Sequence, residues 1–336
     1  MIRLLYMADW HMRGSNPRNR TDDYKEALKA KLLESFDLAK KWEVEAILTP
    51  GDIWDSFVVS IGTLLEFADF INEHSHGIPI LTTFGQHDVQ GYNAASLYRT
   101  SLALLERLVP NIKIYTSPDQ VAATMGPSGK IEAIITFTPY SRKMDLNGYG
   151  YSPELTDEDL VYYKNTPKIH VAHGTLLDHE PPFEKFTLVE DVVTTADLVL
   201  TGDYHPGYGL IKRPDGKVFY NPGSLTRTKA SEAEIAREIA VGLITVDGRD
   251  IDVKTLKLLS AKPGDEVLDR SRIEAEKERA YAMDTFSALM QTKTGGVVLL
   301  DINSIVEAIA TQEATAPHIV KAALELIDAQ RENVTA

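Results

Sequence analysis

Five short polar clusters, each directly after an apolar run, constrain this chain more than any other feature of its sequence. They are Asp9-Trp10-His11, Gly51-Asp52-Ile53-Trp54-Asp55, Gly85-Gln86-His87-Asp88, His173-Gly174 and Gly202-Asp203-Tyr204-His205. An apolar run that stops abruptly at an Asp/His pair is typical of a buried strand that delivers side chains to one edge of a sheet. Any one cluster could occur by chance, but five in order predict a shared site.

The residue types in these clusters indicate metal binding. Hard divalent cations prefer carboxylate oxygens, and intermediate ones also accept imidazole nitrogen. Seven or eight such groups on one edge of a sheet are enough to hold two metal ions a few ångströms apart. Two metals so placed favour in-line attack on a phosphate ester.

The pattern of apolar residues predicts an α/β fold from the N-terminus to about Arg227. Helices are expected at Thr21–Val44, Ile61–Asn72 and Ser96–Leu108, between short apolar strands. Two strands around a Pro214-Asp215-Gly216 turn add antiparallel pairing. We therefore predict a layered mixed β-sheet core flanked by helices.

Three regions are expected along the chain. Residues 1–235 form the core domain, and residues 236–300 form a small α+β capping region built from a hairpin around Asp247-Gly248 and a helix. Residues 301–336 form a helical tail, whose last helix carries an apolar stripe that must be buried against the core or against another chain.

Composition narrows the class of protein. The chain has 336 residues and no cysteine, which excludes disulfides, thiolate zinc sites and a cysteine nucleophile. No apolar run reaches the length of about 18 residues that a membrane helix needs, and the N-terminus lacks the features of a signal peptide. The net charge of −14 argues against a protein that binds nucleic acids or other polyanions over its whole surface. We expect a cytoplasmic protein with no membrane association.

The clusters resemble the signature of the calcineurin-like metallophosphoesterase superfamily, which runs Asp-x-His, Gly-Asp-x-x-Asp, Gly-Asn-His-Asp/Glu, His and Gly-His-x-His. Within it, the loop of residues 13–24 and the turn at 221–227 look most like the SbcD-type nuclease subunits of DNA-break repair, especially phage-encoded recombination versions. The resemblance implies a DNA exonuclease and single-strand endonuclease. It also implies a homodimer and a partner, an SbcC-type coiled-coil ATPase that would bind residues 301–336.

The resemblance also assigns metal ligands. One metal is expected on Asp9, His11 and His205, a second on Gln86, His173 and Asp203, and Asp52 is expected to bridge the two. Gln86 replaces the family's asparagine and Asp203 replaces its histidine, so the second site has more oxygen and less nitrogen than usual. This shift predicts Mn²⁺, with Mg²⁺ as the alternative, over softer ions.

Other residues receive catalytic or binding roles. His87 resembles the catalytic histidine that is not a ligand, Asp88 would orient its imidazole, and Asp55 would support the ligand shell. Arg13, Arg18 and Arg20 form a basic loop that could contact the DNA backbone or simply be solvated.

Two other functions stay open from the sequence. One is a calcineurin-like phosphatase or phosphodiesterase that acts on nucleotides or phosphoproteins. The other is a non-catalytic scaffold that binds DNA ends with a defective second metal site.

Overall fold

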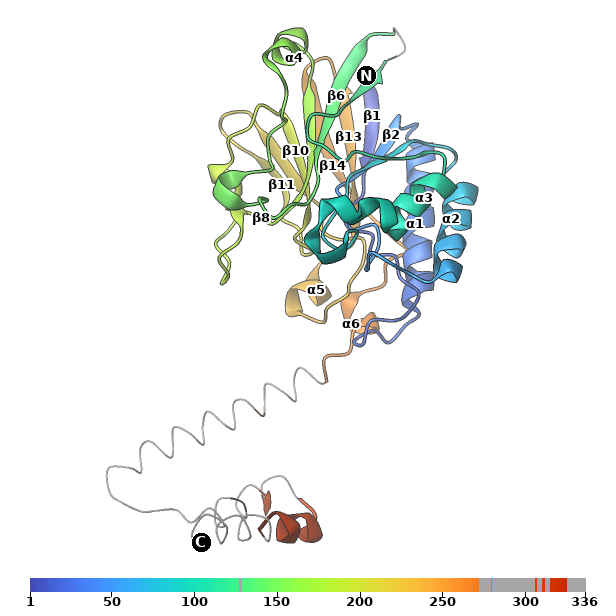
Figure 1. Ribbon diagram of the computed structural model, residues 1–336, viewed down its shortest axis with the longest axis vertical. Helices are drawn as coiled ribbons and strands as arrows, with labels where there is room; N and C mark the ends of the chain where they lie inside the picture. The colour runs from blue at the N-terminus through green and yellow to red at the C-terminus, as the bar shows by residue number, and fades with distance from the viewer. Residues whose placement is uncertain (127–128, 272–278, 280–305, 307–309, 312–314, 325–336) are drawn as a thin grey trace, which may run out of the picture. The chain divides into compact units, whose positions relative to one another are not determined.

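Figure 1 shows the computed structural model, which describes residues 1–126, 129–271, 279, 306, 310–311 and 315–324. The chain divides into two units, Met1–Arg270 and Ser271–Ala336. In the second unit, residues 317–324 are helical. Most of the predicted tail, and most of the helix predicted to end the capping region, lie outside the described residues. Among the described residues, no helix combines the length and the apolar character needed to cross a bilayer.

The first unit contains two six-stranded sheets. The first sheet has, in spatial order, β14 (Asp250–Lys257), β13 (Ala240–Asp247), β1 (Ile2–Tyr6), β2 (Ala46–Thr49), β3 (Ile80–Thr82) and β4 (Ile112–Ile114). The strands from β1 to β4 are parallel, whereas β13 is antiparallel to β1 and to β14. The carboxyl ends of β1, β2 and β3 therefore meet at one edge.

The second sheet has the same mixed character. Its order is β11 (Gly209–Lys212), β12 (Val218–Asn221), β10 (Leu198–Asp203), β7 (Lys168–Gly174), β6 (Ile131–Thr138) and β5 (Val121–Met125). Strands β12, β10, β7 and β6 are parallel, and β11 and β5 are antiparallel edge strands. Strands β8 (Leu176–Leu177) and β9 (Thr187–Leu188) form a separate pair.

The two sheets pack face to face around a shared apolar core. Side chains from both sheets, such as Leu4 and Tyr6 of β1 and Ile169 of β7, belong to one buried cluster. The opposite face of the first sheet is covered by α1 (Tyr24–Lys41), α2 (Ile61–His74) and α3 (Ser101–Leu108) (Figure 1). The predicted layered mixed sheet with flanking helices is thus confirmed.

Capping side chains set where the two long helices begin. Asp23 accepts a hydrogen bond from the backbone N–H of Glu26 at the start of α1, and Ser60 accepts one from Thr63 at the start of α2. The remaining short elements are α4 (Asp157–Tyr162), α5 (Glu232–Ala236), α6 (Gly264–Val267), η1 (Gln90–Tyr92), η2 (Ala94–Arg99), η3 (Leu146–Gly148) and η4 (Val189–Asp191).

Two predicted boundaries differ from the structure. The single helix predicted at Ser96–Leu108 is divided into η2 and α3, because Thr100 between them is extended and Ser96 bonds to the backbone of Gln90 and Asn93. The predicted hairpin after residue 235 is present, but it completes the first core sheet through β13 and β1 instead of forming a separate cap.

Candidate metal centre

The predicted ligands lie at strand ends of both sheets. Asp9 follows β1, Asp52 follows β2 and Gln86 follows β3, whereas His173 and Asp203 lie at the ends of β7 and β10. Because the sheets pack face to face with these ends together, residues far apart in sequence become neighbours. Asp9 Oδ1 of the first sheet lies 3.7 Å from His173 Nδ1 of the second.

Asp9, Asp52 and His173 form a fully buried group. Their candidate ligand atoms lie within 4.8 Å of one another. His173 Nδ1 is 3.2 Å from the backbone carbonyl oxygen of Pro50, to which it can donate a hydrogen bond. Such a bond leaves Nε2 as the nitrogen available to a metal, and Nε2 lies 3.4 Å from Asp52 Oδ2.

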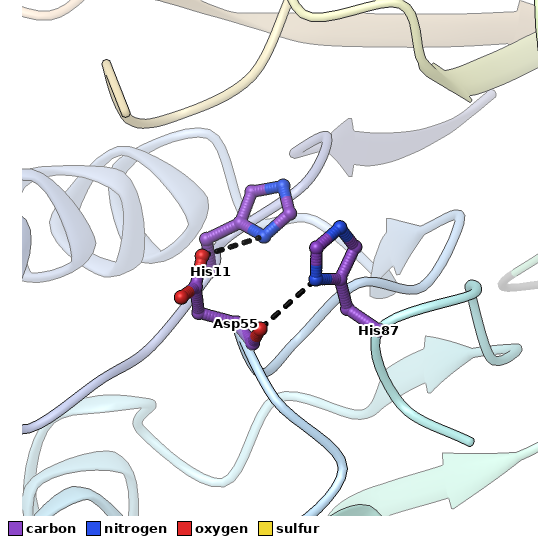
Figure 2. A group of neighbouring side chains, drawn as sticks. All are labelled: His11, Asp55 and His87. Carbon is purple, nitrogen blue, oxygen red and sulfur yellow. Dashed lines mark hydrogen bonds and ion pairs between the residues drawn. The ribbon is translucent and has the colours of Figure 1, made fainter. Parts of the chain in front are cut away.

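Three histidines, His11, His205 and His87, lie next to this buried group. His11 Nε2 lies 2.8 Å from His205 Nε2 and 3.9 Å from Asp52 Oδ2. Asp52 Oδ2 thus faces one histidine of each predicted site, as a bridging carboxylate must. Figure 2 shows the other side of His11, where its Nδ1 is 3.6 Å from Asp55 Oδ1 and its ring meets His87.

The two departures from the family pattern contact each other. The side-chain amide of Gln86 donates through Nε2 to Asp203 Oδ1, and the Thr175 hydroxyl donates to Asp203 Oδ2. The backbone N–H of Asp203 in turn donates to both oxygens of Asp9, at 3.2 and 3.1 Å. With its Nε2 committed to Asp203, the amide of Gln86 keeps its carbonyl oxygen Oε1 as the atom that remains for a cation.

Four of the predicted ligands have strained backbones. Asp9, His11, Asp52 and Asp203 have φ angles of 40°, 48°, 46° and 74°, in the left-handed region that residues with a side chain rarely occupy. Each such residue costs on the order of 1–3 kcal/mol and persists where the surrounding structure demands it. Their concentration at one edge of two sheets marks this edge as a functional site.

Two glycines allow the ligand loops to approach closely. A Cβ atom at Gly51, whose φ is +110°, would overlap the backbone of Phe84 and Gly85. A Cβ atom at Gly85 would overlap the carboxylate of Asp52 and the ring of His173. The loops after β2 and β3 can therefore meet only with glycine at these positions.

Unpartnered buried atoms show that the site fits a divalent cation. Asp52 Oδ2, Gln86 Oε1 and His173 Nε2 are buried without a hydrogen-bond partner in the structure. Asp52 Oδ2 and His173 Nε2 lie 3.4 Å apart as an ion pair without a hydrogen bond, so a cation has room to bind both. A buried polar atom without a hydrogen bond costs about 1–3 kcal/mol, and a bound ion would remove that cost. Carboxylate oxygen, amide oxygen and imidazole nitrogen are a donor set suited to Mn²⁺ or a similar ion.

The pKa shifts at the site reflect an excess of buried negative charge. Burial and the neighbouring Asp52 raise the pKa of Asp9 to about 7. Burial disfavours protonation of His173, but the carboxylates of Asp52 and Asp9 outweigh it and raise the pKa of His173 to about 10. Burial lowers the pKa of His205 to about 4, which keeps this imidazole neutral and able to bind a metal.

His87 is held by Asp55 and not by Asp88. His87 Nδ1 lies 2.9 Å from the backbone carbonyl oxygen of Asp55, and its side chain is exposed (Figure 2). Burial lowers the pKa of His87, but the carboxylates of Asp52 and Asp55 raise it, and the net change is an increase.

The predicted orienting role of Asp88 needs correction. Its oxygens accept hydrogen bonds from the backbone N–H groups of Trp54 and Gly85, at 3.1 and 3.0 Å. Asp88 ties the two ligand loops together.

The three predicted DNA-binding arginines differ in their surroundings. The Arg20 guanidinium makes two 2.7 Å hydrogen bonds to the carboxylate of Asp22, and its side chain is only 3% exposed. Arg13 pairs with Asp55 Oδ2 at 2.8 Å. Arg18 is exposed. The geometry thus gives Arg20 a structural role in its own loop and Arg13 a place beside the metal centre. Of the three, Arg18 alone is exposed.

Some residues at the site were not predicted from the sequence. Thr175 bonds to Asp203, and the ring of Tyr140 lies 6.4 Å from that of His173. Thr175 lies two residues after His173, so the cluster could have been extended to include it. Tyr140 follows β6 and carried no signal, since only the pairing of β6 with β7 brings it there.

The contact between Gln86 and Asp203 predicts coupled effects on metal binding. We expect Gln86→Asn and Asp203→His each to weaken Mn²⁺ binding by about 10-fold or more, because each variant breaks the shared hydrogen bond. The double variant should bind more tightly than the sum of the single losses predicts, by about 1 kcal/mol or more. Calorimetric Mn²⁺ titrations of the four proteins measure this coupling, and additive losses would show that the two side chains act independently.

Comparisons with known proteins identify the relatives of the chain. A family model described as calcineurin-like phosphoesterase matches residues 2–207. No curated protein matches the chain. Among solved structures, TT1561 of Thermus thermophilus is 12% identical with a TM-score of 0.43, over 76% of this chain and 98% of that one. The NAD nucleotidase NadN of Haemophilus influenzae is 12% identical with a TM-score of 0.40, over 76% of this chain and 50% of that one.

Proposed function

The chain belongs to the calcineurin-like phosphoesterase family, and from this premise we propose that it is a two-metal DNA nuclease of the SbcD type. The family implies metal-dependent hydrolysis of phosphoesters at a dinuclear site. The observation that carries the proposal is the position of Asp52, whose Oδ2 has no hydrogen-bond partner and lies 3.9 Å from His11 Nε2 and 3.4 Å from His173 Nε2.

The residues at the site suit such a reaction. Asp9, His11 and His205 would hold one ion, Gln86, His173 and Asp203 a second, and Asp52 both. Ions bound there would supply Lewis-acid activation of water and neutralise charge on the phosphate. If His87 is the imidazolium, its Nδ1–H donates to the Asp55 carbonyl oxygen and its Nε2–H remains to give a proton to the departing oxygen. The raised pKa of His87 favours this charged form.

DNA as the substrate rests on the resemblance and on charge. The exposed Arg18 lies in the loop that follows His11, where a basic side chain could contact a phosphate of the strand. The chain as a whole is acidic, with a net charge of −14. Such a protein needs a partner to hold DNA, and an SbcC-type coiled-coil ATPase in the cytoplasm would supply it. A homodimer, as the resemblance implies, is part of the same proposal.

The choice of substrate distinguishes this function from its alternatives. With Mn²⁺ present, we expect cleavage of linear double-stranded DNA and of single-stranded circles, resolved on denaturing gels. Cleavage of nucleotides or phosphopeptides without cleavage of DNA would instead assign a phosphatase. Binding of DNA ends without cleavage of any ester would assign a scaffold. An equivalent Asp52→Asn sample controls for contaminating nucleases.

The partner proposal has its own test. Residues 301–336 contain none of the metal-binding clusters, and residues 317–324 within them are helical. A chain truncated before Ser304 should cleave a small phosphodiester normally but no longer retain the ATPase in a pull-down. A truncated chain that retains the ATPase would place the contact elsewhere.

The ligand set predicts a metal preference. Three carboxylates (Asp9, Asp52, Asp203) and an amide favour hard ions, so Mn²⁺ should support the highest turnover, with Mg²⁺ weaker and Zn²⁺ weakest. We expect Mn²⁺ to exceed Zn²⁺ by about 10-fold or more at saturation, in line with the fixed geometry that such sites need. The measurement is turnover of one phosphodiester with each metal added to chelator-treated protein. Highest turnover with Zn²⁺ would contradict this assignment.

A further inference from the structure

An aromatic side chain lies directly beside the predicted second metal site. The ring of Tyr140 meets that of His173 edge to face, with centroids 6.4 Å apart and planes at 78°. The backbone N–H of Tyr140 donates to the carbonyl oxygen of Phe84 at 2.9 Å, which fixes it to the loop that carries Gln86. Tyr140 is therefore held in place by the same loop that positions a ligand.

A second tyrosine extends this surface into solvent. The ring of Tyr92 lies 5.8 Å from that of Tyr140, and Tyr92 is 56% exposed. Its φ angle is 59°, in the left-handed region, where a tyrosine is strained. Burial of the Tyr92 ring in the core does not offset this strain. A strained backbone without such compensation is expected where the residue has a function.

A lysine adds positive charge to the two rings. Lys185 is exposed, and its Nζ lies 5.5 Å from the centroid of the Tyr140 ring. Two aromatic rings and one ammonium group thus lie beside a site suited to a phosphate ester, and these are the groups that contact the base and the phosphate of a nucleotide. Aromatic rings stack on any nucleobase, and a lysine attracts its phosphate.

We propose that Tyr92, Tyr140 and Lys185 form a nucleotide platform that binds the base next to the scissile phosphate. The inference rests on the proposed function and deepens it, since it names a single-stranded or unstacked nucleotide as the form bound at the site. A base within a duplex has no free face to stack on a tyrosine, so the platform favours DNA ends and single strands.

Two small substrates isolate the contribution of the base. Thymidine 5′-(p-nitrophenyl phosphate) and methyl p-nitrophenyl phosphate share the leaving group, but only the first has a base. For Tyr92→Ala, whose ring does not contact a predicted ligand, we expect KM for the thymidine ester to rise about 5- to 100-fold, the range for one lost base–aromatic stack, with kcat little changed. KM for the methyl ester should stay within about 2-fold.

Matched variants separate stacking from general damage. Tyr92→Phe keeps the ring and should keep the wild-type KM. Tyr98→Ala is the control, because Tyr98 is also exposed, at 68%, and also lies beside a cation, Arg99 at 5.3 Å from its ring. Lys185→Gln should raise KM for a trinucleotide and weaken its dependence on salt.

The outcomes distinguish the platform from the function on which it rests. If the wild-type protein hydrolyses neither ester with Mn²⁺, the proposed phosphodiesterase function fails. If it hydrolyses both, but Tyr92→Ala leaves KM for the thymidine ester unchanged, the platform is overturned and the phosphodiesterase stands. An equal loss on both esters would also overturn the platform, because it would show damage to the metal centre and not loss of stacking.

Discussion

Asp52→Asn is expected to lower phosphodiester cleavage by about 10³-fold or more, which corresponds to about 4 kcal/mol of transition-state stabilisation. Asp52 Oδ2 faces both His11 and His173, so its charge is needed by both predicted metals. Two close cations repel strongly in a buried site unless a carboxylate lies between them. The variant should therefore bind fewer than two Mn²⁺ ions per chain, measured by elemental analysis.

The asparagine variant keeps the local hydrogen bonding that a shorter side chain would lose. Asp52 Oδ1 accepts a 2.9 Å hydrogen bond from the backbone N–H of His87, and an amide oxygen can replace it. Asp69→Asn, at an exposed position of α2, is the matched control and should retain full activity. Retention of two metals and near wild-type cleavage by Asp52→Asn would show that Asp52 is not a bridging ligand.

His87→Ala is expected to reduce DNA cleavage by about 10²-fold while both metals stay bound. His87 is exposed beside the ligands, and its Nδ1 is already engaged by the Asp55 carbonyl, so neither metal requires it. If it protonates the leaving oxygen, its loss should matter less for a p-nitrophenyl ester, whose leaving group departs without a proton. The measurement is the ratio of the two losses, with metal content determined on the same samples.

A control histidine and a clear counter-result complete this test. His76→Ala removes a histidine that pairs with Asp37 outside the site, and it should change neither activity. Loss of a metal ion in His87→Ala would make His87 a ligand together with His11 and Asp55, which lie close enough to form such a group (Figure 2). Equal losses on both esters would instead argue against proton donation.

Strand ends and core helices could be predicted because they depend on local patterns. The apolar runs before Asp9, Asp52 and Asp203 are buried strands, and the helix expected around Leu28 and Phe36 is α1. The hairpin of β13 and β14 was also predicted from its turn. The strand with which this hairpin pairs was not predicted. The pairing of β13 with β1 joins residues more than 230 positions apart, and no local signal specifies which strand the edge of a sheet will accept.

The residue types at the site were predictable, whereas their contacts were not. The predicted ligands do gather, and the orphaned atoms of Asp52 and His173 are consistent with their assigned role. Asp88 was given the wrong partner because an adjacent residue in sequence can point to the backbone of another loop. Arg20 was read as a free charge, but Asp22 two residues later neutralises it. Such choices depend on side-chain geometry that spacing does not encode.

Metal stoichiometry and cleavage, measured together on one preparation, test whether two bound metal ions are needed for hydrolysis. Chelator-treated protein is titrated with Mn²⁺, and bound metal and hydrolysis of thymidine 5′-(p-nitrophenyl phosphate) and linear DNA are followed at each step. We expect two Mn²⁺ ions per wild-type chain, and cleavage of both substrates that appears only as the second ion binds. Full cleavage with one ion or none, or two bound ions with no cleavage of either substrate, would contradict it.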